Sequence, residues 1–216
     1  MPTFGINAQC RKSRRKKGSI SMKITKKIWC SVAAVISLIT GGAIVGQEYL
    51  QPVGQVVIEG QALGELRISP KGLEMTGNAE GCRLDPYTCP SGLVTNGVGN
   101  THGVPDNPVS LEQVAKDWVR NLQEAERCVE SVERASGKPM TQGQFDAFTS
   151  FAFNTGCQRY KRNSNRTATQ IYRLSLEGNY PQACAELKRW VYGGGVKQPG
   201  LIIRRDIEYE RCIALD

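Results

Sequence analysis

The sequence predicts an α+β protein that is mostly helical, carries one small β-hairpin lobe and is preceded by an N-terminal membrane segment. Three patterns predict this arrangement. Apolar residues recur at helical spacing through much of 110–213, two short β-prone runs flank a Cys-Pro-Ser-Gly turn at 82–98, and 19 uncharged residues follow one another at 28–46. A chain of 216 residues has room for one ordinary domain and an extension, so we expect a single core.

Residues 1–27 are expected to form a basic cytoplasmic leader. They hold nine of the 28 Lys and Arg residues, and the first acidic residue of the chain is Glu48. From residue 28 onward, 19 basic and 20 acidic residues give a net charge of −1, although the whole chain carries +8. The globular part therefore lacks the basic character of a nucleic-acid-binding domain, and we expect no nucleic-acid partner. A nucleic-acid-binding arm in the leader remains an alternative, and Met22 is a second candidate start site.

Residues 28–46 have about the length that a helix needs to cross ~30 Å of hydrocarbon. Positive charge lies only on their N-terminal side, which predicts a cytoplasmic N-terminus and an external domain. Ser, Thr and Gly dilute the apolar character, so residence in the bilayer should be weak. Three fates are open: cleavage near Ala43, permanent anchoring, or release of the intact segment. Residues 47–67 follow as a connector, too long for an ordinary loop and more typical of a tether.

The remaining residues, 68–216, are expected to form the catalytic domain. Ser69 as cap and Pro70 at the first helical position begin a helix that runs to Glu80 and ends at Gly81. Two capping boxes predict the starts of the next two helices, at 110–113 and 141–144. Further helices are expected at 167–176, 182–192 and 200–213.

Three side chains at fixed spacing form the candidate site. Glu80 is followed after eight residues by Cys89, and Cys89 after five residues by Thr95. A glycosidase needs an acid that protonates the leaving oxygen and a second group that activates water or stabilises the oxocarbenium ion. Glu80 suits the first task, provided that burial keeps it protonated near neutral pH, and the hairpin behind it can supply the second.

This pattern resembles the catalytic motif of the T-even type phage lysozymes, glycoside hydrolase family 24 endolysins, in which Glu, Asp or Cys, and Thr follow one another at the same two gaps. The resemblance covers roughly 66–216 and extends to PMTQGQFDAFTSFAFNTG and GLIIRRDIEYERC, which are similar to the central and closing helices of the family. It implies a lysozyme-like fold and hydrolysis of the β-1,4 bond between N-acetylmuramic acid and N-acetylglucosamine in peptidoglycan. It also implies a monomer that needs no metal or organic cofactor.

The resemblance assigns Glu80 as the acid and Thr95 as the group that orients water through its hydroxyl. Cys89 stands where most relatives carry Asp. The segment at 28–46 is similar to the signal-anchor-release segment of some phage endolysins, which inserts uncleaved and later leaves the membrane. The protein is then expected at the inner membrane of the bacterial host, facing the periplasm, and afterwards free in the periplasm.

Eight cysteines suit an oxidising compartment. Cys82 and Cys89 can bond across the hairpin, either as a permanent staple or as a switch. In the switch, which resembles thiol-switched members of the signal-anchor-release endolysins, Cys30 leaves the bilayer, attacks Cys82 and frees Cys89. The remaining cysteines of the domain are expected to pair as 128 with 157 and 184 with 212.

Two alternatives remain for the function. One is a lytic transglycosylase, which uses one carboxylate and releases an anhydro-sugar. The other is a non-catalytic, membrane-tethered peptidoglycan-binding protein. His102 is the only histidine, which argues against a zinc amidase and a Ser-His-Asp hydrolase. Asp85, within the hairpin, is a weaker candidate for sugar binding.

Overall fold

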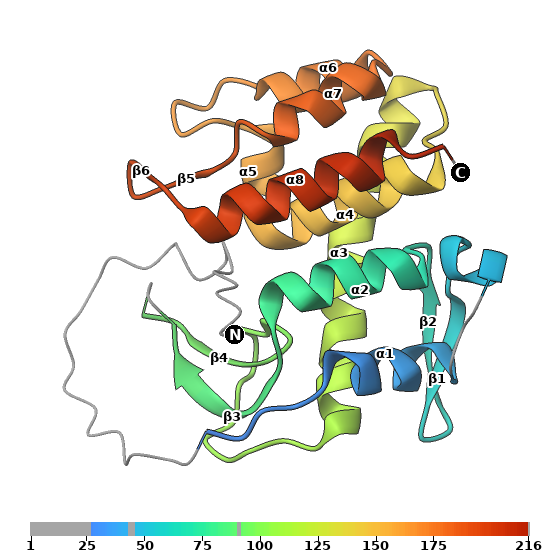
Figure 1. Cartoon of the computed structure of the whole chain (residues 1–216), viewed down its shortest axis with the longest axis vertical. Coiled ribbons are helices and arrows are strands. Elements are labelled where there is room, and N and C mark those ends of the chain that lie inside the picture. The colour runs from blue at the N-terminus through green and yellow to red at the C-terminus, as the bar shows by residue number, and fades with distance from the viewer. Residues whose placement is uncertain (1–26, 43–45, 90–91, 216) are drawn as a thin grey trace.

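The computed structural model describes residues 27–42, 46–89 and 92–215 (Figure 1). The predicted leader lies almost wholly outside this range. In chain order the helices and strands are α1 (Val32–Thr40), the 3-10 helix η2 (Gly46–Leu50), β1 (Gly54–Ile58), β2 (Gln61–Leu66), α2 (Pro70–Glu80), β3 (Arg83–Thr88), β4 (Val94–Gly97), α3 (Leu111–Ser136), α4 (Gln142–Thr155), α5 (Cys157–Lys161), α6 (Gln170–Leu176), α7 (Tyr180–Leu187), β5 (Tyr192–Gly193), β6 (Val196–Lys197) and α8 (Pro199–Ile213).

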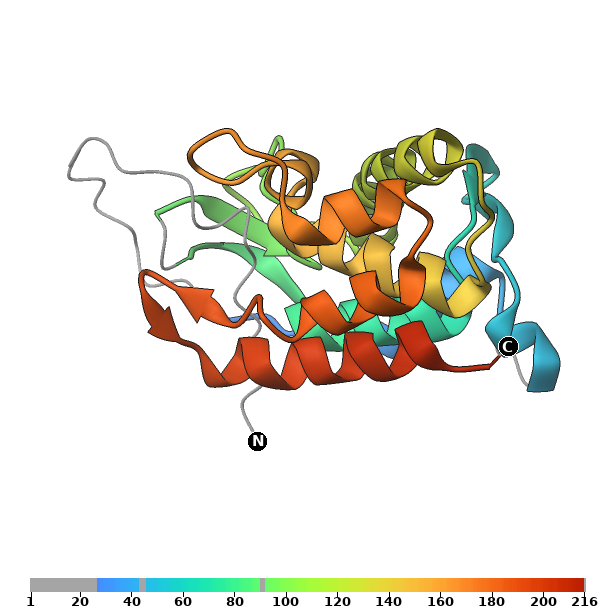
Figure 2. The ribbon, with the colours of Figure 1, turned by 90° about the horizontal axis from the view of Figure 1, so that it is seen from above.

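The described elements form two lobes joined by the long helix α3. Figure 1 shows α1, α2 and the hairpins β1–β2 and β3–β4 in one lobe, and α4 to α8 with the short hairpin β5–β6 in the other. Figure 2 shows α8 lying along the edge of the molecule beside α2, and the two helices are in contact. The prediction of a mostly helical α+β fold is confirmed, but the described residues form three antiparallel hairpins where one was expected.

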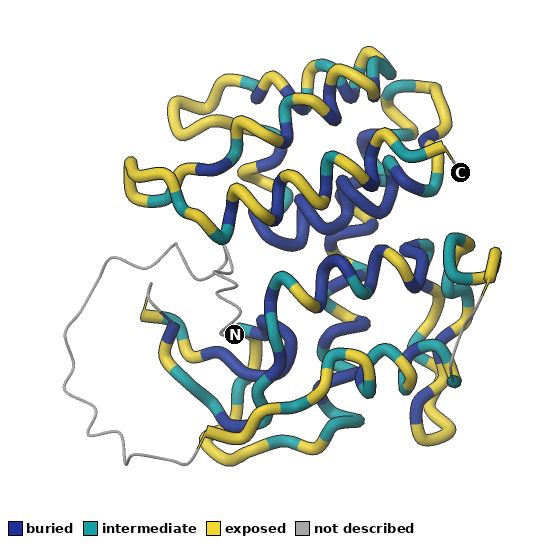
Figure 3. Tube along the Cα trace, in the orientation of Figure 1, coloured by how far each residue is buried: buried dark blue, intermediate teal, exposed yellow. Residues whose placement is uncertain are grey.

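The core is built on α3 and α4. Thr141 and Gln144 form the predicted capping box, and Ser110 accepts a hydrogen bond from the Gln113 amide at 3.1 Å. α3 buries one face, whereas α4 is buried almost all round (Figure 3). A helix that is buried on every side lies at the centre of a fold, and α4 contacts α2, α3, α5, α7 and α8.

Within the stretch predicted to cross a membrane, Val32–Thr40 form α1, which packs on the domain. Ser31 caps this helix, Gly41 ends it in the left-handed conformation, and Val35 and Ile39 are buried against α2 and α3. Within the described residues, no helix has the length and apolar character to span a bilayer. In this structure Val35 and Ile39 of the stretch that suggests lipid face the protein core, whereas Ile28 and Trp29 are exposed.

The predicted connector is not a loose tether, because most of it forms the hairpin β1–β2. Val56 and Ile58 point into the core, and the strands are joined by Glu59 and Gly60, both with positive φ. Two consecutive residues of positive φ are the signature of the hairpin turn whose twist matches that of the strands. The alternation at Val56 and Ile58 was the sequence signal for these strands.

Two of the expected disulfides are confirmed. Cys128 bonds Cys157 and Cys184 bonds Cys212, with Cα–Cα distances of 5.7 and 5.8 Å. The first joins α3 to α5, and the second joins α7 to α8. Both therefore fasten the helical lobe to itself, away from the hairpin that carries the candidate site.

Candidate active site

Glu80 is the last residue of α2, as the sequence predicts. At the other end of this helix, Ser69 accepts a hydrogen bond from the Gly72 amide at 3.0 Å. The Ser69 amide in turn donates to Asp146 Oδ1 of α4 at 2.8 Å. Gly81 then ends the helix at φ 73° and ψ −177°, a conformation that only glycine adopts readily. Anchored at its start and broken at its end, α2 presents Glu80 at the junction of the lobes.

The carboxylate of Glu80 is held by Arg204 of α8. Arg204 Nη1 donates to Glu80 Oε1 at 2.5 Å. The side chain of Arg204 is 4% exposed and that of Glu80 is 1% exposed. Arg204 also donates to Glu208 at 2.9 Å and to the Ser150 carbonyl at 3.1 Å. Burial lowers the pKa of Arg204, but the carboxylates of Glu80 and Glu208 outweigh it, and the net pKa is raised. The guanidinium therefore stays charged and fixes the position of Glu80.

Sequence reasoning missed Arg204. The Arg-Arg pair of the closing helix was noted only as part of the family resemblance. Neighbouring Arg205 instead bonds Glu208 and Asn154, and lies over the Phe151 ring. The available signal is the Arg-Arg pair directly after the apolar run Leu-Ile-Ile. An arginine beside such a run is a candidate for burial, and a buried arginine needs a carboxylate partner.

Cys89 and Thr95 lie together on the hairpin that follows Glu80. Thr95 is fully buried in β4, and Cys89, directly after β3, is nearly so. The Cys89 amide donates to the Leu93 carbonyl at 2.9 Å, and Thr95 Oγ1 donates to the same carbonyl at 3.4 Å. Cys89 and Thr95 thus bond the same Leu93 carbonyl oxygen at the end of the hairpin.

Tyr87 connects this hairpin to Glu80. It pairs with Thr95 across the two strands, so their side chains lie on the same face. Its pKa is raised, first by burial and then by the negative charge of Glu80. The charge of Glu80 therefore acts on Tyr87, the residue that pairs with Thr95 across the hairpin.

The disulfide at this site joins Cys30 to Cys82, with a Cα–Cα distance of 5.0 Å. Cys82 is therefore not bonded to Cys89 in the structure, and the expected staple between them is absent. Cys89 is itself disulfide-bonded, so the free thiol expected after exchange is also not seen. The pairing at Cys82 matches the second stage of the expected switch, whereas the state of Cys89 does not.

The segment before α1 adds an edge to the hairpin. Leu84 donates to the Ile28 carbonyl at 2.8 Å, and the Cys30 amide donates to the Cys82 carbonyl at 3.1 Å. Asp85, fully buried, accepts from the Ile28 amide at 2.7 Å and forms an ion pair with Arg83. Burial raises the pKa of Asp85, but the hydrogen bonds from Arg83 and Ile28 lower it by a larger amount, so the pKa lies below its usual value. Asp85 is therefore a buried support and does not present its carboxylate to a sugar.

An apolar groove lies elsewhere, between α2 and α8. It has a volume of about 1020 Å³ and an apolar lining that includes Met75, Ile203 and Ile207. Ala79 and Arg204 line the groove, so it borders the arginine that binds Glu80. Neither Glu80 nor the hairpin residues line it. Within the described residues, no group of three or more His, Cys, Asp or Glu side chains is arranged to hold a metal ion.

Comparison with known proteins agrees with this geometry. The family model of the phage lysozymes matches residues 77–208. The chain is 42% identical over 156 residues to a SAR-endolysin of Escherichia phage P1, covering 69% of this chain and 83% of the relative. It is 36% identical over 200 residues to a SAR-endolysin of Haemophilus phage HP1, covering 90% of this chain and 99% of the relative.

A solved structure of similar fold is the active form of the P1 phage endolysin Lyz. The TM-score is 0.68 at 35% identity, over 86% of this chain and 95% of that chain. Because the family model matches more than half of the sequence and the relatives align over most of both chains, this chain belongs to the phage lysozyme family.

Proposed function

We propose that the chain is an endolysin of the T-even, family 24 type that hydrolyses the β-1,4 bond between N-acetylmuramic acid and N-acetylglucosamine in peptidoglycan. The observation that carries the proposal is the placement of Glu80. Its carboxylate is buried at the end of α2, fixed through Oε1 by Arg204, and adjacent to the hairpin that carries Cys89 and Thr95. Of the two carboxylate oxygens of Glu80, only Oε1 accepts a hydrogen bond from another described residue. Oε2 is therefore the atom that is left to meet a glycosidic oxygen.

In this mechanism Glu80 gives a proton to the glycosidic oxygen while the bond to the anomeric carbon breaks. Thr95 Oγ1 accepts a hydrogen bond from a water molecule and directs it at that carbon. The oxygen of the water forms the new bond. Its proton passes to Cys89, which occupies the place of the family's Asp and can act as a thiolate only after the disulfide that it forms in this structure has been opened. The protein acts as a monomer, and no step draws on a cofactor.

Substitution of Glu80 tests the assignment. The Gln side chain of E80Q keeps an oxygen for Arg204 but has no proton to donate, so this variant should hydrolyse peptidoglycan roughly 10²–10⁴-fold more slowly without unfolding. Turbidity loss of outer-membrane-permeabilised cells measures the rate. The matched control is Glu177→Gln, because Glu177 is exposed and its loss should change nothing. Wild-type activity in purified E80Q protein would refute the role of Glu80.

A lytic transglycosylase is the second candidate, and the absence of a second carboxylate at Cys89 favours it. Such an enzyme closes the sugar on itself and releases an anhydro-product, whereas a hydrolase adds water and leaves a reducing end. Mass spectrometry of the digested glycan separates the two. If purified protein binds peptidoglycan and releases no product, the non-catalytic alternative holds.

We further propose that residues 28–46 hold the protein at the inner membrane, facing the periplasm, until they leave the bilayer and pack as α1. The SAR-endolysin relatives support this. While the segment is in lipid, Cys82 and Cys89 are bonded. After release, the Cys30 thiolate attacks Cys82, forms the Cys30–Cys82 bond and expels Cys89 as a thiolate.

Non-reducing peptide mapping of the membrane-bound and soluble forms tests the exchange. The membrane form should contain the Cys82–Cys89 bond, and the lytic form should contain Cys30–Cys82 with a free thiol at Cys89. Cys30→Ser should be exported yet inactive. Full lysis by that variant would refute the switch and leave the enzyme assignment intact.

A further inference from the structure

Trp29 is exposed beside β3 of the hairpin that carries the candidate site, unlike the other tryptophans of the chain. Its exposed fraction is 64%, whereas Trp118 is 1% exposed and Trp190 is partly buried. A tryptophan left in solvent forgoes the large gain from burying its ring. An exposed ring at a fixed position next to a substrate site is therefore a candidate contact for the substrate.

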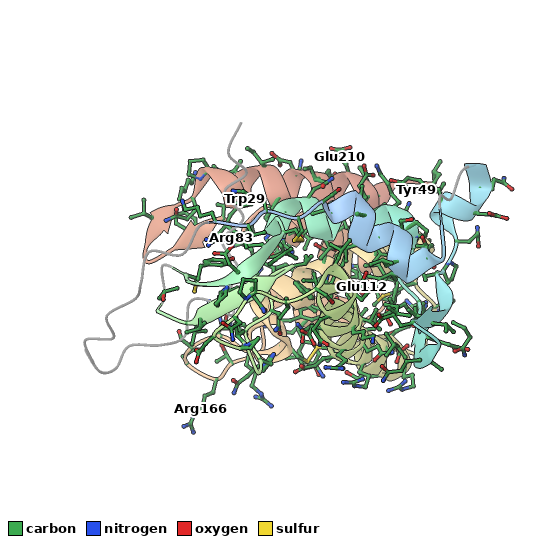
Figure 4. All side chains as sticks on the ribbon, turned by 90° about the horizontal axis from the view of Figure 1, so that it is seen from below. Trp29, Tyr49, Arg83, Glu112, Arg166 and Glu210 are labelled. Carbon is green, nitrogen blue, oxygen red and sulfur yellow. A yellow bond between two sulfur atoms is a disulfide. The ribbon has the colours of Figure 1, made fainter. Side chains whose placement is uncertain are left out.

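The backbone holds Trp29 at the edge of the catalytic hairpin. Trp29 forms an antiparallel bridge with Arg83, and the residues on either side, Ile28 and Cys30, bond the hairpin backbone. The Cys30–Cys82 disulfide locks this edge. Figure 4 shows Trp29 and Arg83 side by side where the N-terminal segment passes over β3.

Three side chains stand in a row on this surface. The Arg83 guanidinium carbon lies 5.8 Å from the centroid of the Trp29 ring and 4.3 Å from that of Tyr87. Directly opposed residues share a face of a sheet. Trp29 therefore lies on the same face as Arg83, and Tyr87 lies on the same face as Thr95. The row Trp29–Arg83–Tyr87 thus begins at the outer edge of the sheet and ends at Tyr87, which pairs with Thr95.

We propose that Trp29 is a substrate-binding residue, and that the row Trp29–Arg83–Tyr87 is a platform on which an N-acetylhexosamine of the glycan strand stacks. This proposal rests on the proposed function, since it names a subsite next to Glu80 and Thr95. The flat apolar face of a pyranose suits an aromatic ring, and a guanidinium held between two rings suits the sugar's hydroxyl and amide oxygens.

Arg83 is preorganised for this task. It donates through Nε and Nη2 to the buried carboxylate of Asp85, which fixes the plane of the guanidinium before a sugar arrives. A fixed guanidinium loses less conformational entropy on binding than a mobile one. The platform also depends on the docked N-terminal segment, so glycan affinity depends on the position of residues 28–30.

A membrane role competes for the same residue. Trp is enriched where a membrane segment meets the interface, and Trp29 lies at the start of the uncharged stretch. The structure favours the glycan, because Trp29 here is anchored to the hairpin through both neighbours and shares Arg83 as a contact with Tyr87. A bilayer contact becomes an outcome of the test.

The experiment uses the full chain and chitotetraose, a β-1,4-linked N-acetylglucosamine oligomer, as probe. In an E80Q background, which prevents turnover, Trp29→Leu should weaken binding about tenfold, and Trp29→Phe should retain most of it, because a ring remains. With Glu80 present, W29L should raise KM for peptidoglycan by a similar factor and leave kcat unchanged. Val57→Ala, an exposed apolar site on β1, is the matched control and should change nothing.

A second measurement needs no change at Trp29. Saturating chitotetraose should protect the exposed tryptophan of E80Q protein from quenching by acrylamide, and peptide mapping checks that Cys30–Cys82 is retained in W29L. Equal affinities for W29L and its parent, absence of protection, or a W29L defect confined to membrane release would overturn the platform. If the parent hydrolyses peptidoglycan while W29L binds normally, the platform fails and the proposed function stands. If the sugar protects Trp29 but no variant, the parent included, hydrolyses peptidoglycan, the platform stands and the proposed function fails.

Discussion

Arg204 of α8 and Glu80 of α2 form an ion pair between side chains that lie 124 positions apart in the sequence. The two residues come from different lobes, so the candidate acid is positioned by the lobe opposite the hairpin. Arg204 is in turn held by Glu208 and Ser150. The position of the acid therefore depends on the docking of α8 onto α4.

Removing Arg204 should cost both stability and activity. Arg204→Ala leaves the carboxylate of Glu80 buried without its partner, which should lower the free energy of unfolding by about 3–5 kcal/mol, whereas Glu208 keeps its ion pair with Arg205. Denaturant unfolding measures this loss, and the lysis assay should show a parallel loss of activity. Lys188→Ala is the control, because its ion pair with Asp206 is exposed and spans 4.0 Å, worth less than ~1 kcal/mol. Unchanged unfolding of R204A would contradict the assigned role.

Glu126 of α3 should make the protein less stable as the pH rises. Burial raises its pKa to about 7, although bonds from the backbone of Ile68 and Arg67 oppose the shift. The folded protein therefore holds this proton more tightly than the unfolded chain. The resulting stability is complete below the unfolded pKa, near 4.5, and is lost as the pH rises through about 7.

Glu126→Gln isolates that contribution. The Gln side chain can still accept from the Ile68 amide, which donates to Glu126 Oε1 at 2.6 Å, but it has no charge to bury. E126Q should match the parent near pH 5 and exceed its free energy of unfolding at pH 8 by about 1–3 kcal/mol. Unfolding curves at both pH values measure the difference, and exposed Glu124→Gln should show none. An equal pH dependence in E126Q and its parent would rule out Glu126 as the cause.

Local signals predicted much of this structure. The Ser69 cap, Pro70 and Gly81 gave the bounds of α2, and the turn residues after Cys89 gave the hairpin β3–β4, because caps and turns depend on a few neighbouring residues. The spacing of Cys89 and Thr95 from Glu80 located the end of α2 and the hairpin that follows it, where Cys89 and Thr95 bond the same carbonyl. Their catalytic roles stay predictions.

Long-range relationships were not predictable in this way. An uncharged stretch at 28–46 suits lipid and a protein core equally well by composition, and only its contacts with α2 and α3 show where α1 lies in this structure. The ion pair of Arg204 with Glu80 joins the two ends of the catalytic domain, and no local pattern selects Arg204 over Arg205. Both cases depend on tertiary packing, which spacing along the chain does not encode.

Gly77 should be essential for the docking of α1. A Cβ atom at this position would lie 2.5 Å from Val32 Cγ1 and 2.8 Å from the Trp118 ring, closer than atoms can pack. Gly77→Ala should therefore displace α1 and lower the free energy of unfolding by about 1–3 kcal/mol. Adding Val32→Ala removes one of the two clashes, so the double variant should lose less than the sum of the single losses. Strict additivity would show that Val32 and Gly77 do not share this contact.

Asp85 should control the docking of the segment that carries Trp29. Asp85→Asn removes the negative charge that accepts from the Ile28 amide and pairs with Arg83, and its amide group presents a donor to the guanidinium. Residues 28–30 should then detach more often, because one of their anchoring bonds is weakened and Arg83 loses its fixed plane. Hydrogen exchange at the Ile28 and Cys30 amides should speed up by about tenfold or more, since each 1.4 kcal/mol lost is a factor of ten. Asp106→Asn, at an exposed position, should leave exchange unchanged, and equal protection in D85N and D106N would show that Asp85 does not hold the segment.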